Sequence, residues 1–490
     1  MTRASRRRAL AGPWGLVDRL ALPAILGLAL ALRLFRLGSD SLWYDEGWSV
    51  MVAHMDILSM PSFIVQNDTH PPLYYALLHA WVVIFGDSEA AVRSLSVVFS
   101  VLLVLVMYLI GRTLAGRAVG LAAALFAALS RFFVQYAQET RNYSLLGLLT
   151  GVSFLLLLRL LERPSRRRAA LYVIATTLLL YTHVYGLFVV LAEALFVLVR
   201  VRAAAPPGPA RRSELGRWAR IGAALLVLYL PWLAILSVQT SEEISGSSRA
   251  NLTWLHSPSA LDLVGTLEAY IGSWVGLGVV SLVALGIALL ARTRGAELKT
   301  FVGEPATIGL ALLLLLPIAV PAALSYASVP IYLKRYTFPA AVAFYLLMAV
   351  LSQRLAPPRY RPIVVTTLAL VLASGTVWYH RTIDKDDWRG VARYVEQRAQ
   401  AHDLVLFDLS WQQTVYDYYR KRADLEERSA ARGLLLQRDG TSVPAGRVWL
   451  IVSAPGKAKS VIPAELGQAY ERRLDRHFTG IDVQFFERPA

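Results

Sequence analysis

The stretch LRLFRLGSDSLWYDEGWS, residues 32–49, joins the end of an apolar segment to an acidic and aromatic loop. From Gly38 to Val92 the sequence has seven Asp and Glu residues and no Lys or Arg, although the whole chain has 50 Lys and Arg against 34 Asp and Glu. Carboxylates next to Trp and Tyr, directly after a hydrophobic segment, are typical of a site at a membrane interface. The pattern predicts a catalytic loop at the outer face of a membrane.

The composition is that of a polytopic membrane protein. Of the 490 residues, 56% are hydrophobic and 17% are charged, and the mean hydropathy is +0.47. Apolar runs recur from Leu20 to Tyr379, and each is close to the ~20 residues that a helix needs to cross a bilayer. The net charge of +16 therefore indicates cytoplasmic loops and anionic lipid, not nucleic acid. The lack of cysteine excludes disulfides and thiolate chemistry.

Basic clusters between the apolar runs give the expected topology. The positive-inside rule places them in the cytoplasm, so that an even number of spans separates each cluster from the next. The count is about eleven crossings, in a range of about 11–13, with the N-terminus in the cytoplasm and the C-terminus outside. The clusters fall at residues 6–8, 112–117, 163–168, 200–220, 292–299 and 354–361.

One apolar stretch would make the number of spans between two basic clusters odd. PPLYYALLHAWVVIF, residues 71–85, is short, begins with two prolines and is rich in aromatic residues. We interpret it as an interfacial or re-entrant helix, which makes residues 38–92 one long outer loop with interfacial helices.

The chain changes character after residue 380. WRGVARYVEQRAQ (388–400) and TVYDYYRKR (414–422) have helical spacing, whereas LVLF (404–407) and RVWLIVS (447–453) are expected to be buried strands. The sequence therefore predicts an all-α membrane domain over residues 1–380 and a small extracytoplasmic α/β domain over residues 381–490.

Asp45 is the candidate catalytic residue of the acidic loop. Trp43 and Tyr44 precede it, and aromatic ring faces commonly line sugar pockets. A carboxylate in such a pocket can take the proton of an acceptor hydroxyl as its oxygen attacks a sugar C1. The alternative is that Asp45 is a solvated loop acid.

Several basic residues stand at span ends that the charge rule places outside. A lipid-linked phosphate bound there needs fixed cations, because a phosphate oxyanion cannot be buried unpaired. The alternative is that each residue pairs with an acid or reaches the lipid headgroups. The candidates for a phosphate site are Arg33, Arg141, Lys334 and Arg335, with Tyr336 beside them as a lining residue.

The order of motifs resembles a known superfamily. The stretch at 32–49 is followed by THPPLYY (69–75), GRTLAGRAVGLAAALFA (111–127) and YAQETRNYSL (136–145). This series is similar to the bacterial integral-membrane glycosyltransferases of the GT-C fold, and most similar to the dolichyl-phosphate-mannose-protein mannosyltransferase-like superfamily. That group includes protein O-mannosyltransferases and lipid A aminoarabinose transferases.

The resemblance implies an inverting sugar transfer from a polyprenyl-phosphate-linked donor. The matching base position is Asp45, with Glu46 as its neighbour. Some relatives have a lysine beside the prolines, where this chain has His70 and Leu73. The remaining matches imply that the site is lined by His70, Gln138, Glu139, Tyr143, His183 and Tyr185.

Other points stay open at this stage. No tightly bound cofactor is expected, and use of a divalent metal is undecided because no spacing imitates a zinc or calcium motif. The acceptor is a glycan, a lipid or a protein, and the membrane is expected to be the bacterial cytoplasmic membrane. Two alternatives are a transporter or flippase of lipid-linked sugars and a non-catalytic subunit of a surface-polysaccharide assembly complex. A transporter would be expected to show internal repeats, and none is evident.

Overall fold

The computed structural model describes residues 16–204, 207–244, 255–292, 303–429, 446–453 and 462–489. The basic clusters at residues 6–8 and 293–299 lie outside these ranges. The chain divides into two compact units. The first contains the described residues up to Phe35, residues 56–77 and residues 93–381, and the second contains residues 36–55, 78–92 and 382 onwards. Each unit is described by itself.

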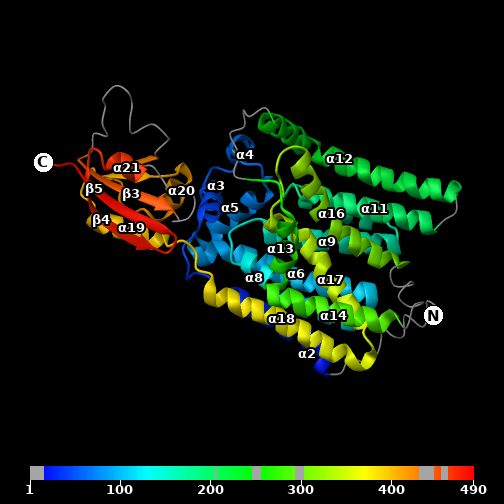
Figure 1. Cartoon of the computed structure of the whole chain (residues 1–490). Coiled ribbons are helices and arrows are strands. Elements are labelled where there is room, and N and C mark those ends of the chain that lie inside the picture. Colours follow the sequence, from blue (N-terminus) through cyan, green and yellow to red (C-terminus); the bar gives the residue numbers. More distant parts are fainter. Residues whose placement is uncertain are drawn as a thin grey trace. The chain divides into compact units, whose positions relative to one another are not determined.

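The membrane-type helices belong almost entirely to the first unit (Figure 1). They are α2 (Leu16–Leu34), α6 (Glu89–Ala115), α7 (Arg117–Leu129), α8 (Arg131–Ala137), α9 (Tyr143–Glu162), α10 (Arg166–Leu180), α11 (Gly186–Ala204), α12 (Pro209–Ile244), α13 (Ala260–Ile271), α14 (Trp274–Arg292), α16 (Pro305–Ala327), α17 (Phe338–Arg354) and α18 (Arg361–Thr382). Shorter elements are α4 (Met60–Asn67), α5 (Leu73–Phe85), η1 (Lys334–Thr337) and η2 (Pro358–Tyr360).

In the described part of the chain, six helices are long and apolar enough to cross a membrane, or up to eight if each bent pair is one span. The expectation of an all-α multi-pass membrane protein is confirmed. The other expected crossings coincide with α2, α10 and α11. The apolar part of α2 has 15 residues, α10 has 15 residues with three arginines, and α11 contains Glu193, Arg200 and Arg202. The expected interfacial segment forms α5, whose 13 residues span only ~20 Å.

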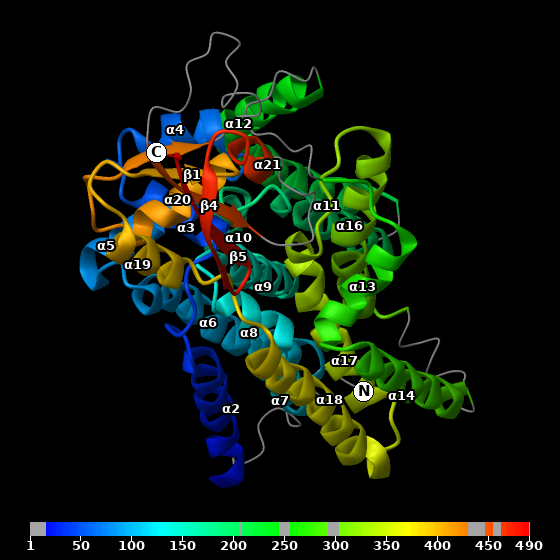
Figure 2. The ribbon, with the colours of Figure 1, turned by 60° about the vertical axis from the view of Figure 1, so that its left-hand side comes forward.

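Two helix pairs are bent for local reasons. Ser130 ends α7 and caps α8, because its hydroxyl accepts a hydrogen bond from the Phe133 N–H at 3.1 Å, and the two axes differ by 57°. Gly272 ends α13 in the left-handed conformation at φ +101°, and α14 departs at 85°. In both views α14 and α18 lie side by side (Figures 1 and 2).

Three helices form the centre of the first unit. In their most apolar windows α6, the α17 segment and α9 are 61%, 72% and 67% buried, whereas α12, α16 and α18 are 22%, 33% and 28% buried. The poorly buried helices therefore present most of their apolar surface outward, as lipid-facing helices do.

The turns expected at the outer face lie together at one end of this unit. The Asn142 amide donates to the Thr182 carbonyl at 3.1 Å, and the Leu73 N–H donates to the Tyr181 carbonyl at 3.2 Å. The Tyr185 hydroxyl donates to the Ile331 carbonyl at 3.1 Å. These bonds join the segments that precede α5, α9, α11 and α17, and so the N-terminal ends of these four helices meet.

The second unit contains a five-stranded sheet of order β2-β1-β3-β5-β4. Its strands are β1 (Leu404–Phe407), β2 (Glu426–Ser429), β3 (Arg447–Ser453), β4 (Glu471–Phe478) and β5 (Ile481–Glu487). β1 pairs in parallel with β2 and β3, while β5 is antiparallel to β3 and β4. The expected small α/β domain is confirmed.

Both faces of this sheet are covered, which explains the unbroken apolar run LVLF. Val405 and Phe407 pack with Trp388 under α19 (Trp388–Arg398) and α20 (Ser410–Tyr419). Leu404 and Leu406 pack on the opposite face, in the core that includes α21 (Ile462–Leu466). The same unit includes α3 (Tyr44–Ala53) from the acidic loop, a feature that the sequence did not predict.

Candidate active site

A buried polar cluster lies where the four helix ends of the first unit meet. Asp68 is its centre, because one carboxylate oxygen is 2.7 Å from His70 Nδ1 and the other accepts a hydrogen bond of 2.5 Å from the Tyr75 hydroxyl. Arg141 donates to the same Tyr75 hydroxyl at 3.4 Å. The side chains of His70 and Asp68 are only 9% and 10% exposed. The acid therefore orients a histidine and a tyrosine, and the tyrosine in turn contacts Arg141.

Electrostatics keep the Asp68 carboxyl ionised. Burial by itself raises the pKa of this carboxyl, but the charge of His70, the hydrogen bonds from His70 and Tyr75, and the charge of Arg141 together hold the pKa well below its usual range. The site thus contains a fixed negative charge that neutralises part of the surrounding positive charge.

A second histidine completes the cluster. The His183 and His70 rings are 5.0 Å apart, and Tyr336 lies 4.6 Å from His183 and 5.8 Å from His70, between ring centres. Burial, His70 and Arg141 lower the pKa of His183 well below its usual value. The Tyr185 N–H donates to His183 Nδ1 at 3.1 Å, and so the neutral ring carries its proton on Nε2.

Both histidines have a nitrogen available to a ligand. Among the described residues, neither His70 Nε2 nor His183 Nε2 has a hydrogen-bond partner, although both atoms are buried. A buried polar atom without a partner costs free energy. A bound group that accepts a hydrogen bond from His183 Nε2 would remove part of this cost.

The segment before α17 lines a cavity of about 330 Å³. Lys334 and Arg335 of η1 face it together with Tyr332, Tyr136 and His256. Asp262, at the start of α13, also lines the cavity and lies 3.8 Å from Lys334 Nζ. Arg335 acts electrostatically on His183, which connects the cavity lining to the histidine cluster.

Several predicted site residues are therefore brought together. Arg141 and Tyr143 contribute from the start of α9, where the Arg141 guanidinium lies 5.9 Å from the centre of the Tyr143 ring. Tyr185 contacts both His183 and Tyr336, with ring centres 5.5 and 5.6 Å apart. Glu139 is buried, and its charge acts on Tyr136.

Two predicted site residues have structural contacts instead. Arg33 is fully buried, and its guanidinium donates to the Ser100 hydroxyl at 2.8 Å and to the carbonyls of Ala29, Ala127 and Ala128 at 3.0–3.2 Å. The Gln138 amide donates to the Arg33 and Phe35 carbonyls at 3.0 and 2.7 Å, which caps the end of α2. These contacts favour a role in helix packing for both side chains.

The acidic loop residues lie in the second unit. Asp45 is half-buried in the first turn of α3, next to Trp43 and Tyr44. Glu46 is fully buried, forms an ion pair of 2.8 Å with Lys385, and accepts a hydrogen bond from the Trp43 N–H at 3.4 Å. Glu46 therefore has the contacts of a structural residue, and Asp45 remains the candidate base.

Asp68 is a site residue that the sequence argument missed. It appeared there only as one of seven acids in the loop. The available signal was its spacing to His70, because an Asp side chain readily accepts a hydrogen bond from the backbone N–H two residues later. The structure shows this bond, from the His70 N–H to Asp68 at 2.9 Å.

No metal centre is evident in the described ranges. Among these residues, no group of three or more His, Asp or Glu side chains could hold a metal ion.

Part of the chain is similar to a known protein family. Residues 69–235 match the family model described as dolichyl-phosphate-mannose-protein mannosyltransferase. No curated protein sequence matches the chain significantly. The structure of ArnT from Cupriavidus metallidurans in the apo state has a TM-score of 0.61 and 14% identity, over 94% of this chain and 97% of that chain.

A second structure of ArnT from the same organism, bound to undecaprenyl phosphate, has a TM-score of 0.60 and 14% identity, over 96% of this chain and 98% of that chain. The archaeal oligosaccharyltransferase AglB from Archaeoglobus fulgidus has a TM-score of 0.52 and 12% identity, over 82% of this chain and 64% of that chain. The protein has the GT-C fold. The predicted resemblance is thereby confirmed. The residues that the family model matches include His70, Arg141 and His183.

Proposed function

We propose that this GT-C protein is a glycosyltransferase that moves a sugar from a polyprenyl-phosphate-linked donor to an acceptor hydroxyl. The observation that carries the proposal is the buried cluster of His70, Arg141 and His183, which lie next to the N-termini of the three helices α5, α9 and α11. Arg335 connects this cluster electrostatically to a cavity that also contains Lys334. ArnT, which has the same fold, has been solved with undecaprenyl phosphate bound, and this lipid is of the same chemical class as the proposed leaving group.

The cluster has the properties of a phosphate site. Helix N-termini present free N–H groups and the positive end of the helix dipole, and both favour anions. Here α5, α9, α11 and α17 begin within a few residues of His70, Arg141, His183 and Tyr336. The Nε2 atom of neutral His183 carries a proton and has no partner among the described residues, so that it can donate to a phosphate oxygen. Guanidinium groups pair with phosphate through charge-assisted hydrogen bonds.

Asp45 is the proposed general base of the reaction. The acceptor oxygen attacks the sugar C1 while its proton passes to the Asp45 carboxylate. The bond between C1 and the phosphate oxygen breaks, and its electron pair leaves with polyprenyl phosphate. Attack from the face opposite the leaving group inverts C1. Arg141, Arg335 and Lys334 stabilise the charge that develops on the phosphate.

The localisation follows from the same reaction. A donor whose polyprenyl chain lies in the bilayer requires a site at the membrane surface. The positions of the basic clusters in the sequence favour the outer face of the bacterial cytoplasmic membrane for the site-forming turns. The C-terminal α/β domain would then be extracytoplasmic. The acceptor is a hydroxyl of a glycan, a lipid or a protein.

The decisive experiment is sugar transfer by the purified full chain in lipid nanodiscs. Synthetic polyprenyl-phosphate sugars serve as donors and envelope extracts as acceptors. The Asp45→Asn variant should fold and bind polyprenyl phosphate like the wild type but lose ~10²–10⁴-fold in turnover.

Asp87→Asn is the matched control. Asp87 is an acid of the same loop, its side chain is 57% exposed, and its carboxylate lies 3.2 Å from His54 Nε2. It should keep wild-type turnover. Full activity of Asp45→Asn would remove Asp45 as the base, and lack of transfer by the wild type with every donor would refute the function.

A further inference from the structure

The turn that carries Asp45 is held by an ion pair with a distant part of the chain. Lys385 Nζ lies 2.8 Å from Glu46 Oε2, and the two side chains are 13% and 0% exposed. Lys385 lies between α18 and α19, at the start of the C-terminal domain. The Glu46 carboxylate also accepts the Trp43 N–H and thereby caps α3. Lys385 therefore fixes the residue next to Asp45.

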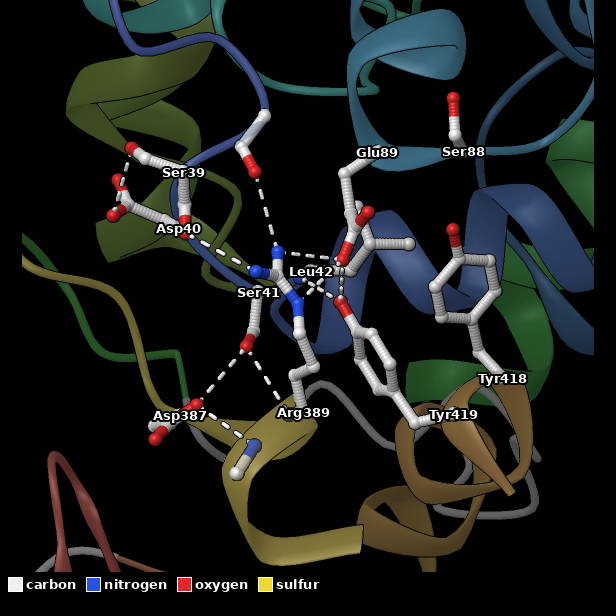
Figure 3. A network of polar contacts seen from close by, with 12 residues as sticks. Ser39, Asp40, Ser41, Leu42, Ser88, Glu89, Asp387, Arg389, Tyr418 and Tyr419 are labelled. Carbon is white, nitrogen blue, oxygen red and sulfur yellow. Dashed lines mark hydrogen bonds and ion pairs between the residues drawn. The ribbon is translucent and has the colours of Figure 1, made fainter. Parts of the chain in front are cut away.

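A second ionic contact holds both ends of the acidic loop, as Figure 3 shows. The Arg389 guanidinium donates twice to Glu89 Oε1, at 2.7 and 3.0 Å, and also reaches the Gly38 carbonyl at 3.3 Å. The Tyr419 hydroxyl donates to the same Glu89 oxygen at 3.0 Å and accepts the Leu42 N–H at 2.7 Å. Arg389 of α19 and Tyr419 of α20 thus bind residues that precede α3, and both also bind Glu89, the first residue of α6.

The loop helix is also packed closely on the C-terminal domain. A Cβ atom at Gly47 would lie 3.2 Å from Val415 Cγ2 and 3.3 Å from Val415 Cα, so that a larger residue would require α3 or α20 to shift by a few tenths of an ångström. The Tyr44 ring lies 5.2 Å from the Trp411 ring, between centres. These contacts all fall inside the second unit, which clusters residues 36–55 and 78–92 with the C-terminal domain.

We propose that Lys385 and Arg389 are positioning residues for the transfer reaction, through which the C-terminal domain holds Asp45 in its reactive orientation. The proposal rests on the proposed function, with Asp45 as base. A general base must come within about 2.6–3.2 Å of the proton that it takes. A half-buried residue on a ten-residue helix keeps such a position only if the helix itself is fixed. Lys385 fixes the first turn of this helix, and Arg389 fixes the chain that enters the loop.

The first test compares Lys385→Met and Arg389→Ala with the wild type in the transfer assay. Both substitutions should displace Asp45 and leave the donor contacts intact. We therefore expect kcat to fall by ~10- to 100-fold and the donor KM to stay within about twofold of the wild-type value. Lys385→Arg keeps the charge and should retain most of the turnover. The control is Arg472→Ala, which removes an exposed arginine that pairs with Asp475 at 3.0 Å on β4.

A second test separates positioning from folding, because Lys385→Met leaves the buried Glu46 unpaired. Adding Glu46→Gln removes the unpaired charge but keeps an acceptor for the Trp43 N–H, since glutamine also serves in a capping box. The double variant should recover the melting temperature of the wild type but not its turnover. Amide hydrogen exchange of residues 44–49 should remain faster than in the wild type.

The outcomes distinguish this inference from the proposed function. If the wild type transfers sugar and Asp45→Asn does not, but Lys385→Met keeps full kcat, the positioning role is wrong and the function stands. If the double variant regains full turnover together with stability, the contact serves folding alone. If the wild type transfers no sugar, the proposed function fails, while faster exchange of residues 44–49 in Lys385→Met would still show that the contact holds the loop.

Discussion

The Asp68 carboxylate and the His70 imidazole share a hydrogen bond of 2.7 Å beneath the protein surface. The bond orients the ring and leaves its Nε2 atom without a partner among the described residues. His70 precedes the two prolines before α5. The pair thus fixes the orientation of the His70 ring at the start of α5.

This arrangement predicts how His70 variants behave. His70→Gln removes the imidazole that Asp68 orients and should raise the donor KM by about tenfold, equivalent to ~1.4 kcal/mol. His70→Lys places a cation next to Asp68 and should recover much of the loss. Steady-state kinetics with a polyprenyl-phosphate sugar measure both, and equal kinetics for all three proteins would exclude His70 from the donor site.

Asp68 predicts a pH dependence of stability. Its folded-state pKa lies below that of an exposed carboxyl, so that the ionised form stabilises the fold above about pH 4 and this contribution disappears as the pH falls further. Asp68→Asn should therefore unfold at a lower temperature than the wild type at pH 7, by the equivalent of ~1–3 kcal/mol.

Thermal unfolding of the two proteins from pH 7 to pH 3 checks this prediction. The difference between their melting temperatures should be constant down to about pH 4 and should shrink below it. A difference that grows with acidification would show that the carboxyl is protonated at neutral pH.

Gly265 gives a test of Lys334 that leaves Lys334 itself unchanged. A Cβ atom at Gly265 of α13 would lie 2.6 Å from Lys334 Nζ, the end of a flexible side chain. Gly265→Ala should therefore displace the ammonium group at little cost to the fold, and alanine itself favours the helix by ~0.5–1 kcal/mol. We expect a higher donor KM with an unchanged or higher melting temperature.

Gly222→Ala on α12 is the matched control, since nothing lies within 4 Å of its added Cβ. It should change neither the donor KM nor the affinity for polyprenyl phosphate. An unchanged donor KM in Gly265→Ala, together with unchanged kinetics of Lys334→Ala, would remove Lys334 from the phosphate site.

Arg33 is predicted to matter for stability and not for the reaction. Arg33→Met removes the donors to Ser100 and to three carbonyls, and buried acceptors without partners cost ~1–3 kcal/mol each. The variant should show a lower melting temperature and a lower yield of folded protein. Its kcat per folded molecule, from activity normalised by size-exclusion chromatography, should match the wild type; a selective rise in donor KM would instead return Arg33 to the phosphate site.

Periodicity and charge were sufficient to predict much of the architecture. The helical turns at residues 138–142 and near His183 follow from apolar runs of spanning length between arginine clusters, because water and lipid sort such segments without reference to tertiary contacts. LVLF and RVWLIVS form β1 and β3 as expected, since a strand buried on both faces must be apolar at every position. The α7 and α13 bends were not predicted, because they depend on single residues, Ser130 and Gly272, within otherwise apolar runs.

The sequence by itself determined that this chain crosses a membrane, that it has a separate α/β domain, and that the turns expected at the outer face carry unusual cations. Only the tertiary structure decided what surrounds each of these cations. Arg33 and Arg141 have similar positions in the sequence pattern, but Arg33 is enclosed by helix carbonyls while Arg141 meets Tyr75 beside Asp68. Hydropathy and charge act on each segment separately, whereas the partners of a buried charge come from segments far apart in the chain. The selection of Asp68, and the inclusion of α3 with the C-terminal domain, therefore required the fold.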